Sequence, residues 1–395
     1  MNNNGSSGYD WIEAGLKELR EQGLERTLRK FEDVGGKFHD NAGKSLNFSS
    51  NDYLGFARNE KIIAAGIAAF RSYGASAASS RLISGTLPCH SELEEHLAKF
   101  KGYPAALAFG SGYLTNLGII SALVGREDAV IADRLAHAIL IDGAIMSRAN
   151  LKRFQHNDPD HLAKSLEDEK DAKHRLVVTE SVFSMDGDLA PLKEIAAVCA
   201  EHNAMLLVDE AHATGIFGTS GTGRVRELQL ENKVDISMGT LSKALGSYGG
   251  FAACSASMRD WFVNRARSFI YSTALPPASA RAAEEALSIL ESQQTLGQEL
   301  LKRADIFRRR LQEAGFNTGK SASQIIPLIV GKNIKSLRLA ERLRDKRILA
   351  VAIRPPTVPE GTARIRLSVT LDHSQADLEQ AADQIIDAGY AEGIL

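Results

Sequence analysis

The sequence predicts an α/β protein in which a mostly parallel sheet is covered by helices on both faces. Short apolar segments rich in Val, Leu and Ile alternate with helical segments in the middle of the chain, as in "HRLVVTESVFS" before "PLKEIAAVCAEHN". Continuous apolar strands of this kind are typical of a sheet that is buried on both faces. The chain of 395 residues is also too long for a single core, so we expect more than one domain.

Three segments are predicted along the chain. Residues 1–45 form an N-terminal helical segment, because leucines within 10–34 are spaced for one face of a helix. Residues 46–285 form the large α/β domain. A long helical stretch over 279–313 leads into a small α+β domain at 286–395, where a few strands are followed by a final helix.

Composition excludes several classes of protein. The formal net charge is −2, so no global basic field favours nucleic acid. The three cysteines (Cys89, Cys199, Cys254) form no CxxC pair, and we expect reduced thiols in the cytoplasm rather than disulfides or a metal site. The polar N-terminus has no apolar leader, and no apolar run is long enough for a membrane span.

Chemically distinctive residues follow the ends of predicted strands, where ligands bind in sheets of this kind. The stretch "FGSGYLTN" (109–116) runs from a strand directly into a helix. Backbone N–H groups at Gly112 and Tyr113 would face an anion at such a helix N-terminus. The same glycines also fit a plain strand–helix turn, since glycine is the default residue there.

A second strand end, "LLVDEAHATG" (206–215), carries Asp209 and His212. One interpretation is a solvated loop with a capping aspartate, and another is the Walker B element of a nucleotide-dependent motor. The motor needs a GxxxxGK[ST] loop. In the nearest candidate, "GKFHDNAGKS" (36–45), Phe38 stands where the first glycine should be, which argues against this class.

The third strand end, "GTLSKALGSYGG" (239–250), holds Thr240 and Lys243 among small residues and glycines. A single lysine is usually a surface charge, but a surface loop would carry more charge than this one. An amine buried among small residues has a lowered pKa and can form a Schiff base. A non-catalytic binding protein that carries such a lysine is the alternative.

Two further residues, Ser184 in "VFSMDGD" and Arg354 in "AIRPPT", also fall at or just after strand ends. An arginine in a second domain could hold a substrate carboxylate with two hydrogen bonds. Together these residues indicate the cofactor pyridoxal 5′-phosphate (PLP). The helix N-terminus suits its phosphate, the aspartate suits its protonated ring nitrogen, and the lysine suits its aldehyde.

Seven motifs in order resemble the α-oxoamine synthases, PLP-dependent acyltransferases of the aspartate-aminotransferase fold (fold type I). The resemblance covers nearly the whole chain from about residue 10. The motifs are "LNFSSNDYLG" (46–55), "FGSGYLTN", "VTESVFSMDGDLAPL" (178–192), "VDEAHATG", "GTLSKALGSYGG", "IYSTALPP" (270–277) and "AIRPPTVPEGTARIRLSVT" (352–370). The last motif, and "TLSKA" rather than "TLGKA", favour the branch of this family that forms 8-amino-7-oxononanoate in biotin biosynthesis.

The resemblance implies a role for each matching residue at the cofactor. Lys243 would bind the cofactor aldehyde and act as the base, Asp209 would face the pyridinium nitrogen, and His137 would stack on the ring. Ser184 and His212 would reach the phenolic oxygen and its surroundings. The phosphate would be held by Gly112, Tyr113 and Thr240, and by Thr273 of a second subunit, because members of the family are homodimers with shared sites.

The resemblance also implies the reaction, a decarboxylative condensation of L-alanine with a pimeloyl thioester of coenzyme A or acyl-carrier protein. Arg354 would hold the amino-acid carboxylate, and Asn51 would line the pocket. Arg26 and Thr357, together with His137, match positions that contact substrate. Other members join glycine to acetyl-CoA or serine to a long acyl chain, and these reactions are the alternatives.

One segment departs from the family pattern. Many members carry a glycine-rich loop resembling "GSGGSR", whereas this chain has "GASAASSRLISG" (74–85). The added Cβ atoms restrict the backbone there. Because this loop lies near the acyl entrance in the family, the difference bears on the acyl donor rather than on the type of reaction.

Overall fold

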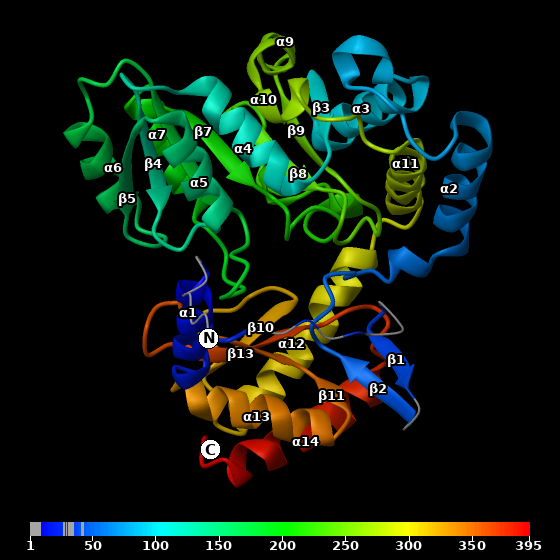
Figure 1. The fold of residues 1–395 in the computed structure, drawn as a ribbon, viewed down its shortest axis with the longest axis vertical. Coiled ribbons are helices and arrows are strands. Elements are labelled where there is room, and N and C mark those ends of the chain that lie inside the picture. Colours follow the sequence, from blue (N-terminus) through cyan, green and yellow to red (C-terminus); the bar gives the residue numbers. More distant parts are fainter. Residues whose placement is uncertain (1–8, 27, 29, 31–34, 41–42) are drawn as a thin grey trace, which may run out of the picture.

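A seven-stranded sheet forms the centre of the larger lobe of the protein (Figure 1). The computed structural model describes residues 9–395 except 27, 29, 31–34 and 41–42. The strand order is β3-β9-β8-β7-β6-β4-β5; β9 is antiparallel to both of its neighbours, and the other neighbouring pairs are parallel. The strands are β3 Ala105–Phe109, β4 Ala129–Asp133, β5 Asn150–Phe154, β6 Arg175–Glu180, β7 Met205–Asp209, β8 Ile236–Thr240 and β9 Gly250–Cys254. This mostly parallel sheet confirms the predicted α/β class.

Alternate residues of the central strands point to opposite faces of the sheet. Val130 and Ala132 of β4 pack into an apolar cluster with α4, α5 and α9. Ala129 and Ile131 pack into a second cluster with α6 and α7 on the other face. The helices are α4 Gly112–Leu123, α5 Ala138–Ser147, α6 Pro159–Asp168, α7 Leu192–Glu201 and α9 Ala256–Arg265. Because helices cover both faces of the sheet, the strands are apolar at nearly every position.

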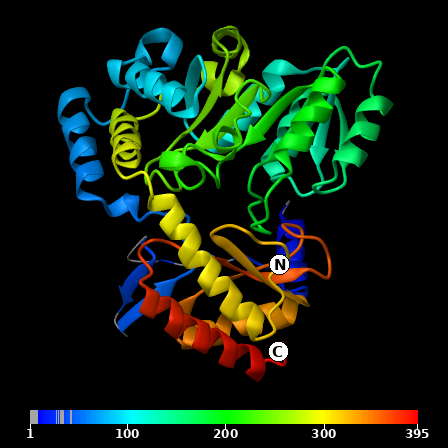
Figure 2. The ribbon, with the colours of Figure 1, turned by 180° about the vertical axis from the view of Figure 1, so that it is seen from behind.

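The smaller lobe holds two three-stranded sheets, β10-β13-β12 and β1-β2-β11, with three longer helices (Figure 2). The strands are β1 Lys37–Asp40, β2 Gly43–Asn47, β10 Ile325–Gly331, β11 Ile348–Leu349, β12 Val351–Ile353 and β13 Ala363–Ser368. The helices are α12 Leu296–Glu313, α13 Asn333–Asp345 and α14 Gln375–Ala391. Ser374 caps α14 by accepting a hydrogen bond from the Asp377 N–H, and α14 is the predicted final helix.

The N-terminal segment differs from the helix predicted over 10–34, of which residues 27, 29 and 31–34 lie outside the described part of the chain. Helix α1 spans only Asp10–Glu21, and Gly23 has a positive φ of 65°, which turns the chain away from the helix. Farther on, β2 pairs with β11 in parallel, with Leu46 opposite Ile348. The end of the segment 1–45 is therefore a hairpin of the smaller lobe. In "GKFHDNAGKS", residues 41–42 lie outside the described part of the chain, and the rest belongs to β1 and β2 and the glycine before them, not to a strand that leads into a helix. This removes the structural basis for the nucleotide-dependent motor.

The helical stretch predicted over 279–313 consists of two helices, α11 (Pro277–Ser292) and α12. Helix α11 packs against α2 (Glu60–Tyr73) and α3 (Pro88–Lys101) in the larger lobe, whereas α12 packs against α14 in the smaller one. The predicted domain boundary between 285 and 286 falls inside α11, and the break between the helices lies at 293–295.

All three cysteines are free thiols in buried positions, so none is available at the surface for disulfide exchange. Within the residues described, no helix is both long and apolar enough to cross a membrane.

Candidate active site

The carboxyl ends of neighbouring strands bring most of the predicted cofactor residues together. They are Thr240 and Lys243 after β8, Asp209 and His212 at the end of β7, Ser184 after β6 and His137 after β4. The Nζ atom of Lys243 lies 2.8 Å from Nε2 of His212. We call Lys243, His212, Asp209, His137 and Glu180 the Lys243 cluster.

Lys243 is an amine with an unusual charge environment. Burial lowers the pKa of Lys243 to about 8, and the positive charge of Arg366 acts in the same direction. The carboxylates of Asp209 and Glu180 oppose this effect but do not cancel it. A larger fraction of this amine is therefore neutral near physiological pH than for an ordinary lysine, as a nucleophile or base requires.

His212 joins Lys243 to the smaller lobe. Its Nδ1 lies 2.7 Å from the hydroxyl of Tyr53, which in turn donates to Oδ1 of Asn51 at 3.1 Å. Burial, followed by the charges of Lys243 and Arg366, lowers the pKa of His212 well below its usual value. The imidazole is therefore neutral, and one ring nitrogen is free to accept a hydrogen bond from a neighbour.

Asp209 is a buried carboxylate that keeps a fixed orientation. Its Oδ2 accepts a hydrogen bond from Nδ2 of Asn116 at 2.8 Å, and its Oδ1 accepts from the Ala211 N–H at 2.8 Å. Its neighbour Glu210 points elsewhere and forms a fully buried ion pair with Lys101. Of the two acidic residues in "VDEAH", only Asp209 contributes its charge to the Lys243 cluster.

His137 and Glu180 close the cluster on the side of β4 and β6. The His137 N–H donates to Oε1 of Glu180 at 2.7 Å, and the His137 side chain caps α5 by accepting from the Ile139 N–H. Burial lowers the pKa of His137 despite the nearby charge of Asp209. Burial and the charge of Asp209 also raise the pKa of Glu180 to about 8, so this carboxyl group holds a proton more readily than an ordinary glutamate.

The N-terminus of α4 lies beside Thr240. A Cβ atom at Gly112 would lie 3.4 Å from Oγ1 of Thr240, and a Cβ at Gly250 would lie 2.7 Å from the Gly112 nitrogen, so glycines allow this close approach. The N–H groups of Gly112 and Tyr113 have no acceptor among the described residues. Two unpaired donors at a helix N-terminus form a site for an anion such as a phosphate.

The donor set as a whole fits pyridoxal phosphate. The α4 N-terminus and the Thr240 hydroxyl could hold the phosphate, Asp209 could face a protonated ring nitrogen, and Lys243 could bind the aldehyde. The unpaired N–H groups of Gly112 and Tyr113 beside the Thr240 hydroxyl are the features that fit the phosphate of such a group.

Arg366 of β13 connects the two lobes at this site. It donates from Nε to the Ser184 carbonyl at 2.6 Å, and its terminal nitrogens lie 3.2 Å from the Tyr53 hydroxyl and 3.3 Å from Oδ1 of Asn51. Ser184 is buried, and its backbone also hydrogen-bonds to Glu180. Ser184 and Asn51 are thus placed at the boundary between the Lys243 cluster and the smaller lobe.

Three predicted substrate residues, Arg26, Arg354 and Thr357, line a separate cavity of about 660 Å³, which we call the arginine cavity. Arg354 donates a hydrogen bond to the Gly23 carbonyl in the turn after α1. Burial lowers the pKa of Arg354, and the nearby charge of Arg26 adds to the effect. Within the described part of the chain, no hydrogen bond or ion pair joins these three residues to the Lys243 cluster.

Thr273 lies apart from the Lys243 cluster as well. It pairs with Ser80 in an isolated antiparallel bridge. Ser80 belongs to the segment 74–85, which differs from the glycine-rich loop of the family. Among the described contacts, none links Thr273 to Lys243 or Thr240. Leu82 and Ile83 are exposed apolar side chains beside this bridge, as is Tyr271.

Sequence reasoning missed four residues that the structure places at the site: Tyr53, Asn116, Glu180 and Arg366. Arg366 had a visible signal, because Arg364 and Arg366 alternate with apolar residues in a strand that is buried throughout. Glu180 also had one, because it ends an apolar strand as Asp209 does. Tyr53 and Asn116 lie in the motifs "LNFSSNDYLG" and "FGSGYLTN", but nothing in their spacing indicates their partners.

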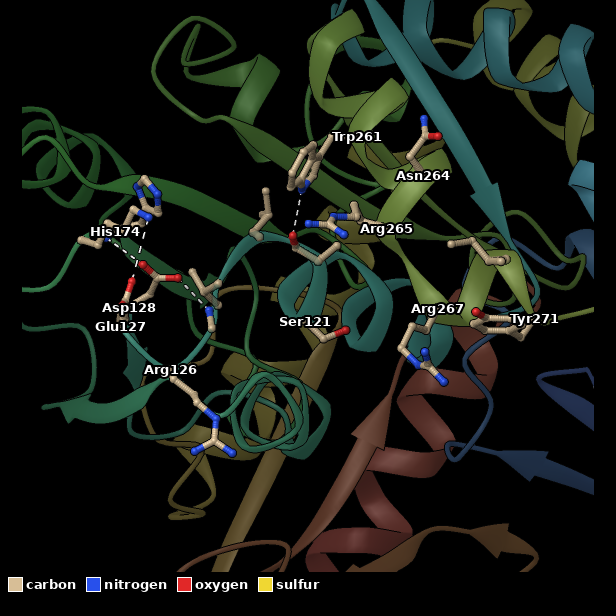
Figure 3. A pocket seen from close by; sticks show the side chains of 16 residues that line it. Ser121, Arg126, Glu127, Asp128, His174, Trp261, Asn264, Arg265, Arg267 and Tyr271 are labelled. Atoms are coloured by element: carbon tan, nitrogen blue, oxygen red, sulfur yellow. Dashed lines mark hydrogen bonds and ion pairs between the residues drawn. The ribbon is translucent and has the colours of Figure 1, made fainter.

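A further cavity of about 830 Å³ contains none of the predicted residues (Figure 3). It lies between the end of α4, the residues that precede β4 and β6, and α9, on the opposite edge of the sheet from Lys243. Its side chains include Arg126 and Arg265, and the Trp261 indole N–H donates to the Ala122 carbonyl at 2.8 Å. This cavity is not part of the site formed by the strand ends.

Known proteins share this arrangement. The sequence profile of the family "Aminotransferase class I and II" matches residues 43–385. The 8-amino-7-oxononanoate synthase of Geobacter sulfurreducens is 44% identical over 387 residues, covering 97% of this chain and 99% of the relative. The synthase of the same name from Geobacter metallireducens is 44% identical over 383 residues, covering 96% and 98%.

Solved structures agree with these relatives. The serine palmitoyltransferase of Sphingomonas wittichii superposes with a TM-score of 0.91 at 32% identity, covering 98% of this chain and 99% of that chain. The 8-amino-7-oxononanoate synthase of Francisella tularensis superposes with a TM-score of 0.76 at 28% identity, covering 88% and 99%. The predicted fold type is thereby confirmed, and the chain belongs to the family of class I and II aminotransferases.

Proposed function

We propose that this chain condenses L-alanine with a pimeloyl thioester and forms 8-amino-7-oxononanoate, carbon dioxide and the free thiol carrier, a step of biotin biosynthesis. The observation that carries the proposal is the Lys243 amine, 2.8 Å from a neutral His212 and within the field of Asp209. The names of the relatives at 44% identity support this substrate pair over the alternatives.

The residues of the site would hold pyridoxal phosphate in a defined orientation. The N–H groups of Gly112 and Tyr113 and the hydroxyl of Thr240 bind the phosphate. Asp209, kept in place by Asn116, keeps a proton on the ring nitrogen by its negative charge. His137 would lie against one face of the ring. When bound, the cofactor withdraws electrons from the α-carbon of the amino acid, which makes the α-proton acidic.

Lys243 is the group that moves the α-proton. Its lowered pKa means that Nζ can accept a proton near neutral pH and return it later in the reaction. His212 lies 2.8 Å from this nitrogen and is neutral, so it orients the amine without adding positive charge. Ser184 and His212 together define the side of the site that faces the smaller lobe.

The substrates would enter from the smaller lobe. Arg354 holds the carboxylate of alanine after exchanging its hydrogen bond with the Gly23 carbonyl for the substrate. Asn51 lines the pocket beside Arg366, and Arg26 and Thr357 contact the acyl substrate in the arginine cavity. His137 also stabilises the negative oxygen that forms when the thioester carbonyl is attacked.

A second copy of the chain would complete the phosphate site with its own Thr273. This proposal explains why Thr273 makes no contact with the Lys243 cluster of its own chain among the described residues. It also explains the exposed apolar side chains near Thr273, because surfaces of this kind mark interfaces. The buried free thiols are consistent with the reducing cytoplasm as the site of the reaction.

Thiol release by the cofactor-loaded protein tests the function with three substrate pairs. They are pimeloyl-CoA with L-alanine, acetyl-CoA with glycine, and palmitoyl-CoA with L-serine, the last because serine palmitoyltransferases share the fold closely. We expect release with the first pair. Release only with one of the other pairs would keep the chemistry of Lys243 and overturn the proposed substrates. Pimeloyl-loaded acyl-carrier protein, compared with pimeloyl-CoA, would then identify the preferred carrier.

A further inference from the structure

A second group of charged side chains, a half-buried histidine between two buried carboxylates, lies at the loops that carry His137 and Ser184. Nδ1 of His156 is 2.9 Å from Oδ1 of Asp133, and its Nε2 is 2.8 Å from Oδ2 of Asp188. Asp133 ends β4, His156 follows β5, and Asp188 lies in the turn after Ser184. We call these three residues the His156 clamp. Neither the cofactor nor the substrate roles proposed above use any of them.

The clamp holds a positive charge between two negative ones. Both ring nitrogens face carboxylate oxygens, so both must carry a proton and the ring is an imidazolium. Burial alone lowers the pKa of His156, but the hydrogen bonds and charges of Asp133 and Asp188 outweigh it and raise the pKa to about 10. His156 therefore stays charged throughout the physiological range, and the clamp is permanent rather than a switch.

One end of the clamp orients the turn that leads to His137. The carboxylate of Asp133 is fully buried and accepts hydrogen bonds from the N–H groups of Leu135 at 2.8 Å and Asn157 at 3.0 Å. The Ala136 N–H donates to the Asp133 carbonyl at 3.1 Å. The next residue is His137, so Asp133 sets the position from which His137 begins α5.

The other end of the clamp fixes the turn that carries Ser184. The Phe183 N–H donates to the Asp188 carbonyl at 3.1 Å, which closes the turn over Ser184. The ring of His156 also packs edge-on against Phe183, with centroids 4.4 Å apart. The side chain of His156 thus connects two loops that follow different strands and that each deliver one residue to the site. Its neighbour Asn157 also bonds both carboxylates, through its N–H to Asp133 and its Nδ2 to Asp188, each at 3.0 Å, but it carries no charge.

We propose that His156 is a positioning residue, whose bridge between Asp133 and Asp188 holds His137 and Ser184 at the spacing that the cofactor requires. It touches neither the cofactor nor the substrate and acts through these two loops. Small displacements of a positioned group are costly in enzymes, so loss of the bridge should reduce cofactor affinity and turnover rather than stability alone.

The experiment compares the unchanged protein with His156→Gln, Asp188→Asn and His96→Gln. His156→Gln removes the charge and one donor nitrogen, and Asp188→Asn weakens one side of the bridge. His96→Gln is the matched control, because His96 also faces a carboxylate, 3.3 Å from Oε2 of Glu291, but lies on α3 outside the clamp. Four quantities are measured: the dissociation constant of pyridoxal phosphate, the visible circular dichroism per mole of bound cofactor, kcat and KM, and the melting temperature.

We expect His156→Gln to weaken cofactor binding and to lower kcat by about tenfold to a hundredfold each, and to reduce the circular dichroism of the bound cofactor. Asp188→Asn should change the same quantities in the same direction but less, because His156 keeps Asp133. KM for the thioester should not change, since no clamp residue lines the arginine cavity. His96→Gln should match the unchanged protein.

A lowered melting temperature with unchanged cofactor affinity, circular dichroism and kcat would show that His156 is only structural, and the proposal would be wrong. If His156→Gln does not fold, the same measurements on Asp188→Asn decide whether the clamp positions the site or is only structural. The effect on kcat rests on the proposed function, but cofactor affinity and circular dichroism do not. Absence of thiol release by the unchanged protein would therefore overturn the proposed function while the clamp remains testable.

Discussion

The Lys243 cluster and the arginine cavity are held in different ways. In the Lys243 cluster, the side chains lie at or just after strand ends, and hydrogen bonds to neighbouring groups hold them, such as Asp209 to the buried Asn116. In the arginine cavity, long side chains come from the turn after α1 and from the segment after β12, and Arg26 is exposed. This difference teaches that the chemical groups lie at the ends of sheet strands, while the proposed substrate contacts lie on segments outside the central sheet.

The largest effect is expected from removing the amine. Lys243→Ala should lower kcat by about 10⁴-fold or more, because no other group in the cluster can take its proton-transfer role. The absorption band of the covalently bound cofactor should disappear as well. Thiol release measures the first effect and the visible spectrum the second. Activity near that of the unchanged protein would show that Lys243 is not the proton-transfer group.

A smaller but still large loss is expected from neutralising the buried carboxylate. Asp209→Asn keeps the shape of the side chain but removes the charge opposite the ring nitrogen, so kcat should fall by about 10²- to 10³-fold. Cofactor should still bind, because the α4 N-terminus and Thr240 are unchanged. Equilibrium titration of the apoprotein separates these effects, and loss of binding with normal turnover per bound cofactor would contradict the assigned role.

The lowered pKa of Lys243 predicts how the apoprotein captures the cofactor. Only the neutral amine adds to an aldehyde, and the pKa of Lys243 is lowered to about 8. Below that pH, the rate of capture should therefore rise about tenfold per pH unit, and it should level off above it. Stopped-flow absorbance measures the rate. A rise that continues to pH 10 would indicate an ordinary, solvated lysine.

Changes in the arginine cavity should act on substrate binding. Arg354→Gln should raise KM for alanine by about tenfold to a hundredfold, the value of a charge-assisted hydrogen bond, with a smaller change in kcat. Arg309→Gln is the control, because Arg309 is an exposed arginine of α12 that pairs with Asp305. If Arg354→Gln changed kcat alone, the proposal that the arginine cavity binds substrate and the Lys243 cluster carries out the chemistry would be wrong.

The smallest effect is expected at the exposed edge of the cavity. Arg26→Ala should raise KM for the pimeloyl thioester by about two- to fivefold, as expected for a charge in contact with solvent, and leave KM for alanine unchanged. Initial rates at varied concentrations of each substrate distinguish the two constants. An increase confined to alanine would place Arg26 with Arg354 at the amino-acid carboxylate instead.

The order of motifs along the sequence predicted the sheet and most of the Lys243 cluster, because strand ends are local features and parallel strands bring their ends together. It did not predict Arg366 or Tyr53 at the site, since their partners lie far away in the chain; Arg366 binds the carbonyl of Ser184, 182 positions earlier. The early end of α1 and the break between α11 and α12 also escaped prediction. In both places the helical spacing of apolar residues continues past the point where the backbone turns.

Covalent trapping tests most directly whether Lys243 is the centre of the chemistry. The cofactor-loaded protein is treated with sodium borohydride and digested, and the peptides are analysed by mass spectrometry. We expect the added mass of the reduced cofactor on the peptide that contains Lys243, and on no peptide in the Lys243→Ala protein. The assignment would be contradicted if the reduced cofactor were found on another lysine. It would also be contradicted if no cofactor were trapped in a protein that releases thiol.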